Sequence, residues 1–296
     1  MHPTIHFKNV TSLIIIGVMT FTGSSVMATA PQETNVSAIG DDALATPRAT
    51  VADFNGDGHP DFVLRNAGTR QTAIWFLNNN IFLSGAFGPT ITIGWLLRSA
   101  ADFNRDSHPD YALLSSTTNQ TAIWYMSGPM FIGGALGPTL TDGWELVETG
   151  DFNGNGFPDY VLFNGTTQQT AIWFLNNNVF VNGVFAPKLP ADWNVVGIAD
   201  FDGDGHEDYL LFNSGNHQTA IWYLSGASFI RGVLGPTITS GWILVGTADF
   251  NNDGHPDYLL YNTVTRQTGI WYLNNNVFLA AALGPTLPVG WSLVGP

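Results

Sequence analysis

The chain has 296 residues, no cysteine, and 23 acidic against nine basic residues, which gives a formal net charge of −14. The absence of cysteine excludes disulfides, thiolate nucleophiles and cysteine-based zinc or iron–sulfur sites. The nine lysine and arginine residues are spread singly and form no basic stripe for a phosphate backbone, so nucleic acid is not an expected partner.

The first 28 residues have the pattern of a secretory signal peptide. Lys8 precedes an apolar stretch over 13–21, and Val26 and Ala28 occupy the small-residue positions before a cleavable bond. The apolar stretch is shorter than the roughly 20 residues that span a bilayer. The alternative is a buried N-terminal strand. We expect cleavage after Ala28, a lead or tether over 29–45, and a periplasmic, cell-surface or secreted location.

From residue 46 to residue 296 the sequence repeats at a spacing of 49 residues, without insertion or deletion. A fixed period of this length indicates one supersecondary unit per repeat. The unit that starts at Trp242 predicts short strands over 242–250, 258–262, 267–273 and 277–283, separated by residues that favour turns. Four antiparallel strands per unit are typical of a propeller blade. The sequence therefore predicts an all-β, five-bladed β-propeller, with an open solenoid of five sheets as the alternative.

The end of the repeat array predicts how the ring closes. A tryptophan starts the first strand of each unit, but the equivalent position before the first unit is Thr46. Trp291 stands five periods after Thr46 and begins a segment with no unit of its own. We expect this C-terminal strand to complete the first blade, which would remove the exposed edges of an open array.

Each unit carries an aspartate-rich loop, at 53–61, 102–110, 151–159, 200–208 and 249–257. Fifteen of the 23 acidic residues are aspartates in these loops, so the negative charge is concentrated there. Oxygen-bearing side chains at loop positions 1, 3, 5 and 9 suit a hard divalent cation, and position 7 can donate its backbone carbonyl. The pattern is like the first half of an EF-hand loop, without the glutamate at position 12. The sequence predicts up to five structural Ca²⁺ ions, with metal-free Asx turns as the alternative.

The predicted side-chain ligands are Asp53, Asn55, Asp57 and Asp61; Asp102, Asn104, Asp106 and Asp110; Asp151, Asn153, Asn155 and Asp159; Asp200, Asp202, Asp204 and Asp208; and Asp249, Asn251, Asp253 and Asp257. The predicted carbonyl ligands at position 7 are His59, His108, Phe157, His206 and His255. Because Phe157 shares this position with four histidines, we expect no zinc or catalytic role for the imidazoles. The loop from Asp200 has the most carboxylates and should bind Ca²⁺ most tightly, and the loop from Asp151 most weakly. Ser107 replaces the turn glycine at position 6.

The segment DFNGDGHPDFVL, which begins at Asp53, and its four copies resemble the FG-GAP or VCBS-type repeat of the integrin α-subunit propeller and of exported bacterial proteins. The companion segment QTAIWFLNNN and its copies resemble the bacterial branch. The resemblance covers residues 46–296. It implies a calcium-stabilised propeller used for adhesion or ligand binding, sometimes attached to an enzyme.

Residues that break the repeat form no set of nucleophile, base and orienting group, so we expect no enzyme activity. A polysaccharide-active hydrolase or lyase with paired carboxylates is the less favoured alternative. The repeats share a glutamine–tryptophan pair that suits sugar stacking, at Gln71 and Trp75, Gln120 and Trp124, Gln169 and Trp173, Gln218 and Trp222, and Gln267 and Trp271. Packing of these tryptophans between blades is the alternative.

Two functional classes follow from the sequence. The first is a monomeric, non-catalytic binding or adhesion module of multivalent, lectin-like type, with five weak glycan sites that gain avidity together. The second is a protein–protein interaction scaffold of the cell envelope. The mature chain contains no second apolar run long enough to be a transmembrane segment.

Overall fold

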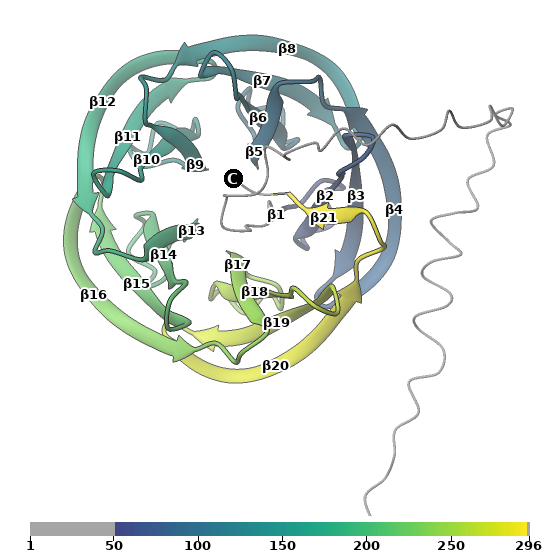
Figure 1. The fold of residues 1–296 in the computed structure, drawn as a ribbon, viewed down its shortest axis with the longest axis vertical. Helices are drawn as coiled ribbons and strands as arrows, with labels where there is room; N and C mark the ends of the chain where they lie inside the picture. The colour runs from purple at the N-terminus through teal and green to yellow at the C-terminus, as the bar shows by residue number, and fades with distance from the viewer. Residues whose placement is uncertain (1–50, 295–296) are drawn as a thin grey trace, which may run out of the picture. The chain divides into compact units, whose positions relative to one another are not determined.

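We describe residues 51–294 of a computed structural model, which form a ring of five antiparallel sheets (Figure 1). The five-bladed propeller predicted from the sequence is confirmed, and the open solenoid is wrong. The predicted signal peptide over 1–28 and the lead over 29–45 lie outside the described residues. Within the described range, no helix is long and apolar enough to cross a membrane.

The strands follow one another in chain order across each blade. Blade 1 contains β1 (Val51–Ala52), β2 (Asp61–Asn66), β3 (Gln71–Asn78), β4 (Ile81–Thr90) and β21 (Trp291–Leu293). Blade 2 contains β5 (Trp95–Ala101), β6 (Asp110–Ser115), β7 (Gln120–Ser127) and β8 (Met130–Thr139). Blade 3 contains β9 (Glu145–Gly150), β10 (Asp159–Asn164), β11 (Gln169–Asn176) and β12 (Val179–Lys188).

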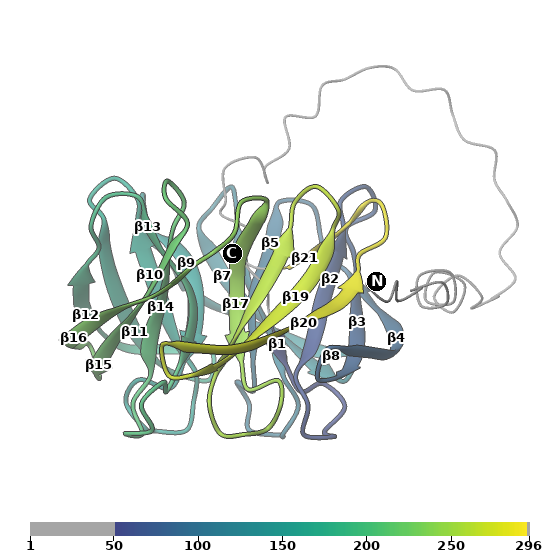
Figure 2. The same cartoon turned by 90° about the horizontal axis from the view of Figure 1, so that it is seen from below.

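Blade 4 contains β13 (Trp193–Ala199), β14 (Asp208–Asn213), β15 (Gln218–Ser225) and β16 (Ser228–Thr237). Blade 5 contains β17 (Trp242–Ala248), β18 (Asp257–Asn262), β19 (Gln267–Asn274) and β20 (Val277–Thr286). Strands β5, β9, β13 and β17 lie nearest the centre of the ring, and β4, β8, β12, β16 and β20 form its perimeter (Figure 1). Figure 2 shows the strands running between the two ends of the ring, where the loops lie.

In the unit that starts at Trp242, four strand boundaries differ from the predicted ones, two of them by a single residue. In blade 5, β17 ends at Ala248, because Asp249 and Phe250 already belong to the loop. The outer strand β20 continues to Thr286, beyond the predicted end at residue 283. In blade 4, the second and third strands are mostly buried, whereas every residue of the outer strand is exposed or half-buried.

The hydrophobic cores lie between neighbouring blades. In each core, the phenylalanine at loop position 2 packs edge-on against an aromatic ring in the second strand of the next blade. Phe54 and Tyr111, for example, have ring centroids 6.1 Å apart at 74°. The pair that joins the last blade to the first is Phe250 and Phe62, also 6.1 Å apart. The conformation of each loop is therefore coupled to the packing of two blades.

Strand β21 closes the ring by pairing with β2, as Figure 1 shows. Trp291 is opposite Asn66 in the register, and the Val294 amide donates a hydrogen bond to the Val63 carbonyl at 2.9 Å. The closure predicted from Trp291 is confirmed. The short strand β1 pairs with the other end of β2, so two segments from opposite ends of the array share the first position of blade 1.

Candidate functional site

The five aspartate loops connect the first and second strands of their blades, so they share one end of the ring. In every loop the position-1 carboxylate accepts a hydrogen bond from the amide at position 6, at 2.6–2.8 Å. The backbone reaches this conformation through two left-handed residues, at positions 4 and 6, with φ of 73° at Gly56 and 84° at Gly58. Ser107, which replaces the glycine at position 6, takes φ of 69°, a conformation that costs a non-glycine residue about 1 kcal/mol.

The position-9 aspartate joins the loop to the sheet. Asp208 Oδ2 accepts a hydrogen bond from the Phe201 amide at 3.0 Å, and Oδ1 accepts one from the Leu224 amide in β15 at 2.9 Å. The same two bonds occur at all five position-9 residues, which are fully buried: Asp61, Asp110, Asp159, Asp208 and Asp257. These carboxylates therefore have a structural role with or without a metal ion.

Burial raises the pKa values of these carboxylates. Desolvation raises the pKa of Asp208 to about 6, against the opposing effect of its two amide hydrogen bonds, and the neighbouring Asp202 and Asp204 raise it further. The pKa values of Asp159 and Asp257 rise to about 7, chiefly through burial. Glu207 also has its pKa raised to about 7 by burial and by nearby aspartates. A bound cation would favour the ionised form of all these groups.

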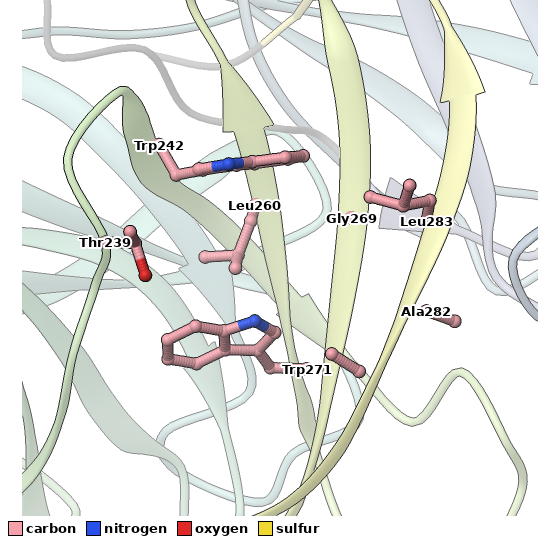
Figure 3. Close-up of a pocket in the computed structure, with 8 residues that line it drawn as sticks. Thr239, Trp242, Leu260, Gly269, Trp271, Ala282 and Leu283 are labelled. Carbon is pink, nitrogen blue, oxygen red and sulfur yellow. The ribbon is translucent and has the colours of Figure 1, made fainter. Parts of the chain in front are cut away.

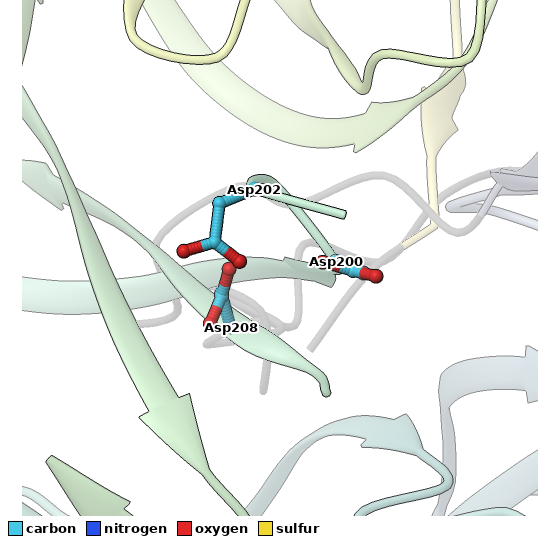
Figure 4. A group of neighbouring side chains, drawn as sticks. All are labelled: Asp200, Asp202 and Asp208. Atoms are coloured by element: carbon cyan, nitrogen blue, oxygen red, sulfur yellow. The ribbon is translucent and has the colours of Figure 1, made fainter. Parts of the chain in front are cut away.

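The fourth loop brings three carboxylates together. Oxygen atoms of Asp200, Asp202 and Asp208 lie within 4.8 Å of one another (Figure 4). The position-5 residue Asp204 is not in this group, and its Oδ1 accepts a hydrogen bond from the His206 amide at 2.9 Å. We predicted side-chain ligands at positions 1, 3, 5 and 9, and in this loop the structure brings together those at positions 1, 3 and 9. Because each carboxylate oxygen has two acceptor positions, this donor set still fits Ca²⁺.

Three other loops have asparagine at position 3 and aspartate at position 5. In the first loop, Asn55 Nδ2 donates to Asp57 Oδ2 at 2.9 Å, and Asn104 and Asn251 make the same bond at 3.0 Å. These side chains lie at the loop surface, where a cation could replace the amide donor. At position 7, the side chains of His108 and His206 are exposed. In the described chain, the predicted histidines form no group with one another that could hold a metal ion.

Arg231, one of the singly spread basic residues, forms an ion pair with the fourth loop. Arg231 Nη2 lies 3.0 Å from Asp202 Oδ2, and its guanidinium stacks over the Tyr223 ring at 3.6 Å. The positive charge of Arg231 offsets the negative charge of Asp202. Asp202 is the additional carboxylate on which the prediction of tightest Ca²⁺ binding rests. The pair could not be foreseen, because Arg231 follows Asp202 by 29 residues and lies on a different strand.

Four of the five predicted sugar-binding glutamines bond across strands. Gln169 Nε2 donates to the Ala186 carbonyl and Gln218 Nε2 to the Gly235 carbonyl, both at 2.5 Å, and Gln120 and Gln267 make equivalent bonds. Each partner tryptophan packs edge-on against a phenylalanine of the outer strand, with centroids 4.9–5.1 Å apart. Trp75 is fully buried, and the other four are half-buried. This arrangement favours the packing interpretation for most of the predicted pairs.

Blade 5 contains an aromatic pocket of about 210 Å³ (Figure 3). The indoles of Trp242 and Trp271 lie on opposite sides of it, and Leu260 lines it between them (Figure 3). The remaining lining residues are Thr239, Gly269, Ala281, Ala282 and Leu283. Trp271 is one of the ligand residues predicted from the sequence, and Trp242 is not.

The pocket depends on Gly269, where the other four repeats have alanine in the QTAIW segment. A Cβ at this position would lie 3.1 Å from Cζ3 and 3.4 Å from Cη2 of Trp242, closer than ordinary van der Waals contact. The absent methyl group therefore leaves room beside the indole. The single change from QTAIW to QTGIW was the signal in the sequence that could have located the pocket.

Comparison with known proteins supports the repeat assignment. The profile of the FG-GAP-like repeat matches residues 53–113, 102–162, 151–211 and 200–260. No curated protein matches the chain. Among solved structures, a chain of the Photorhabdus luminescens Tc holotoxin pore matches with 17% identity and a TM-score of 0.45, over 80% of this chain and 12% of its own. A Bacteroides caccae protein of unknown function matches with 12% identity and a TM-score of 0.42, over 74% and 71% of the two chains.

Proposed function

Because the chain belongs to the FG-GAP-like repeat family, we propose that it is an exported, calcium-stabilised propeller that acts as a non-catalytic binding module for glycans. The family and the fold define a repeat scaffold, and the ligand follows from the chemistry of its sites. The observation that carries the glycan proposal is the pair of opposed indoles, Trp242 and Trp271, in blade 5 (Figure 3).

The pocket has the character of a small carbohydrate site. Small-molecule sites are mostly apolar, with a few polar groups that fix orientation. A pyranose ring has C–H faces that the two indoles can cover, while its hydroxyl groups remain directed to solvent. Thr239 is exposed and supplies a hydroxyl group among the lining residues. The lining has no charged side chain, so the proposed ligand is a neutral sugar.

We expect Gly269→Ala to reduce glycan affinity at least tenfold, which corresponds to about 1.4 kcal/mol. The added methyl group would take up the space beside Trp242. A glycan array with calcium present would identify the ligand, and quenching of tryptophan fluorescence by that glycan would give the affinity of each variant. Trp271→Phe should weaken binding as well. The matched control is Trp222→Phe in blade 4, where Ala220 occupies the position of Gly269, and it should bind as the parent does.

Equal glycan affinity of the Gly269→Ala variant and the parent would contradict the assignment of the site to blade 5. A blank array with an intact fold would contradict the glycan proposal itself and favour the second candidate, a protein-binding scaffold of the cell envelope. One observation favours that candidate: large apolar side chains on the outer strands are exposed, including Leu136 at 64% and Phe185 at 76%. Exposed apolar surface of this kind is typical of protein contacts.

A further inference from the structure

The third aspartate loop receives a positive charge from the second. Arg105, at position 4 of the second loop, donates from Nε to the Gly156 carbonyl at 2.9 Å and from Nη2 to the Asn155 carbonyl. Its guanidinium carbon also lies 3.9 Å from the centroid of the Phe157 ring. Arg105 therefore contacts positions 5, 6 and 7 of the neighbouring loop.

This contact is specific to one pair of loops. At position 4 the first, third and fourth loops have glycine, and the fifth has Asn252, whose amide lies 3.4 Å from His59 Nδ1 of the first loop. Position 4 of one loop thus faces position 7 of the next around the ring, and Arg105 is the one cation at position 4. An arginine side chain remains charged at any pH that the protein tolerates.

The third loop also has the donor set least suited to a divalent cation. It has two carboxylates, Asp151 and Asp159, because positions 3 and 5 are asparagine. Asn155 Oδ1 accepts a hydrogen bond from the Phe157 amide at 2.7 Å, and Nδ2 donates to the Leu175 carbonyl at 3.2 Å. The Nδ2 group of Asn155 therefore bonds to β11, and this nitrogen has no lone pair to offer a metal ion.

We infer that the third loop binds no divalent cation, and that Arg105 of the second loop supplies its positive charge and joins blade 2 to blade 3. A cation in this loop would have only the two loop carboxylates, Asp151 and Asp159, as charged ligands, and the adjacent guanidinium would repel it. The inference rests on the proposed calcium function, since it states which of the loops takes no ion.

Metal analysis of the full chain, with calcium as the probe, tests this inference. After equilibrium dialysis against Ca²⁺, the parent should contain at most four ions. The double variant Arg105→Gly with Asn155→Asp, which introduces the residues that the first and fourth loops have at positions 4 and 5, should contain one ion more than the parent. The matched control is Asn252→Gly, a change at the same position of the fifth loop, and it should leave the ion content unchanged.

Five ions in the parent, or no additional ion in the double variant when it melts as a folded protein, would overturn the inference. Binding of no ion by any loop would instead overturn the proposed calcium function. In that case thermal unfolding decides the role of Arg105: Arg105→Gly should lower the melting temperature relative to Asn252→Gly, and equal melting temperatures would contradict the inter-blade contact.

Discussion

Replacing Asp208 with alanine is expected to lower the free energy of unfolding by about 3 kcal/mol. The substitution leaves the Phe201 and Leu224 amides without their acceptor, and each unsatisfied buried donor costs roughly 1–3 kcal/mol. For a domain of this size, about 3 kcal/mol corresponds to a fall of about 10 °C in melting temperature. Thermal unfolding in EDTA isolates this structural effect from any loss of metal binding.

The control for this prediction is Asp204→Ala in the same loop. Asp204 is exposed, and its Oδ1 accepts a hydrogen bond from the His206 amide at the surface. Its loss should change the stability of the metal-free protein by at most about 0.5 kcal/mol. Asp208→Asn should fall between the two, because its amide oxygen can still accept from one of the two donors. If both alanine variants melt together, position 9 does not join the loop to the sheet.

Removal of residues 291–296 is the second large perturbation, with an expected loss of about 5 kcal/mol. Leu293 packs in the core between blades 5 and 1, Val294 is 4% exposed, and Trp291 stacks on Phe87 with centroids 6.0 Å apart. Burial of one such side chain stabilises a fold by roughly 1.5–3 kcal/mol. The deletion also leaves the edge of β2 from Leu64 to Asn66 unpaired and open to aggregation.

Melting temperature and oligomeric state of the truncated protein, measured by calorimetry and light scattering, test the closure. A synthetic peptide of residues 290–296 added in trans should restore part of the lost stability, because it can pair with β2. The control Ser292→Ala changes an exposed residue of β21 and should have little effect. A truncated protein that stays monomeric and melts with the parent would show that β21 does not hold the ring closed.

The repeat made much of the fold predictable. Each 49-residue unit had to bury the same strands against its neighbours, so the sequence of one unit was sufficient to predict a blade. Trp291, which begins a segment with no unit of its own, predicted the closure. The strand ends were predicted less accurately. Asp249 and Phe250 belong to the loop, but the apolar Phe250 continues the hydrophobic pattern of the strand, so that pattern alone does not separate strand from loop there.

The details of the candidate sites were less predictable, since they depend on direction and on contacts between blades. Residue types showed that the loops carry oxygen ligands, but they did not show that the position-5 side chain Asp204 lies outside the group formed by Asp200, Asp202 and Asp208. The contacts of Arg105 and Arg231 with acidic loops join residues 29 to 51 positions apart. In the blade 5 pocket, Gly269 leaves room beside Trp242, and this glycine is not among the residues that the repeats share.

Thermal unfolding in calcium and in EDTA, compared between pH 5 and pH 8, tests the central claim that cations offset the buried charge of the loops. In EDTA, the folded-state pKa of Asp208 is about 6 against 3.8 for the free side chain, so its ionisation opposes folding. The stability that protonated Asp208 contributes is present at low pH and is lost as the pH rises through 6. Asp159 and Asp257, with pKa values of about 7, extend the loss to neutral pH.

Calcium should reverse this trend, because it binds the ionised carboxylates and stabilises the native state by about 2.7 kcal/mol per site at a concentration 100 times Kd. We therefore expect the melting temperature in EDTA to fall from pH 5 to pH 8, and the difference between calcium and EDTA to grow with pH. Superimposable melting curves in calcium and after rigorous chelation at pH 8 would contradict the account.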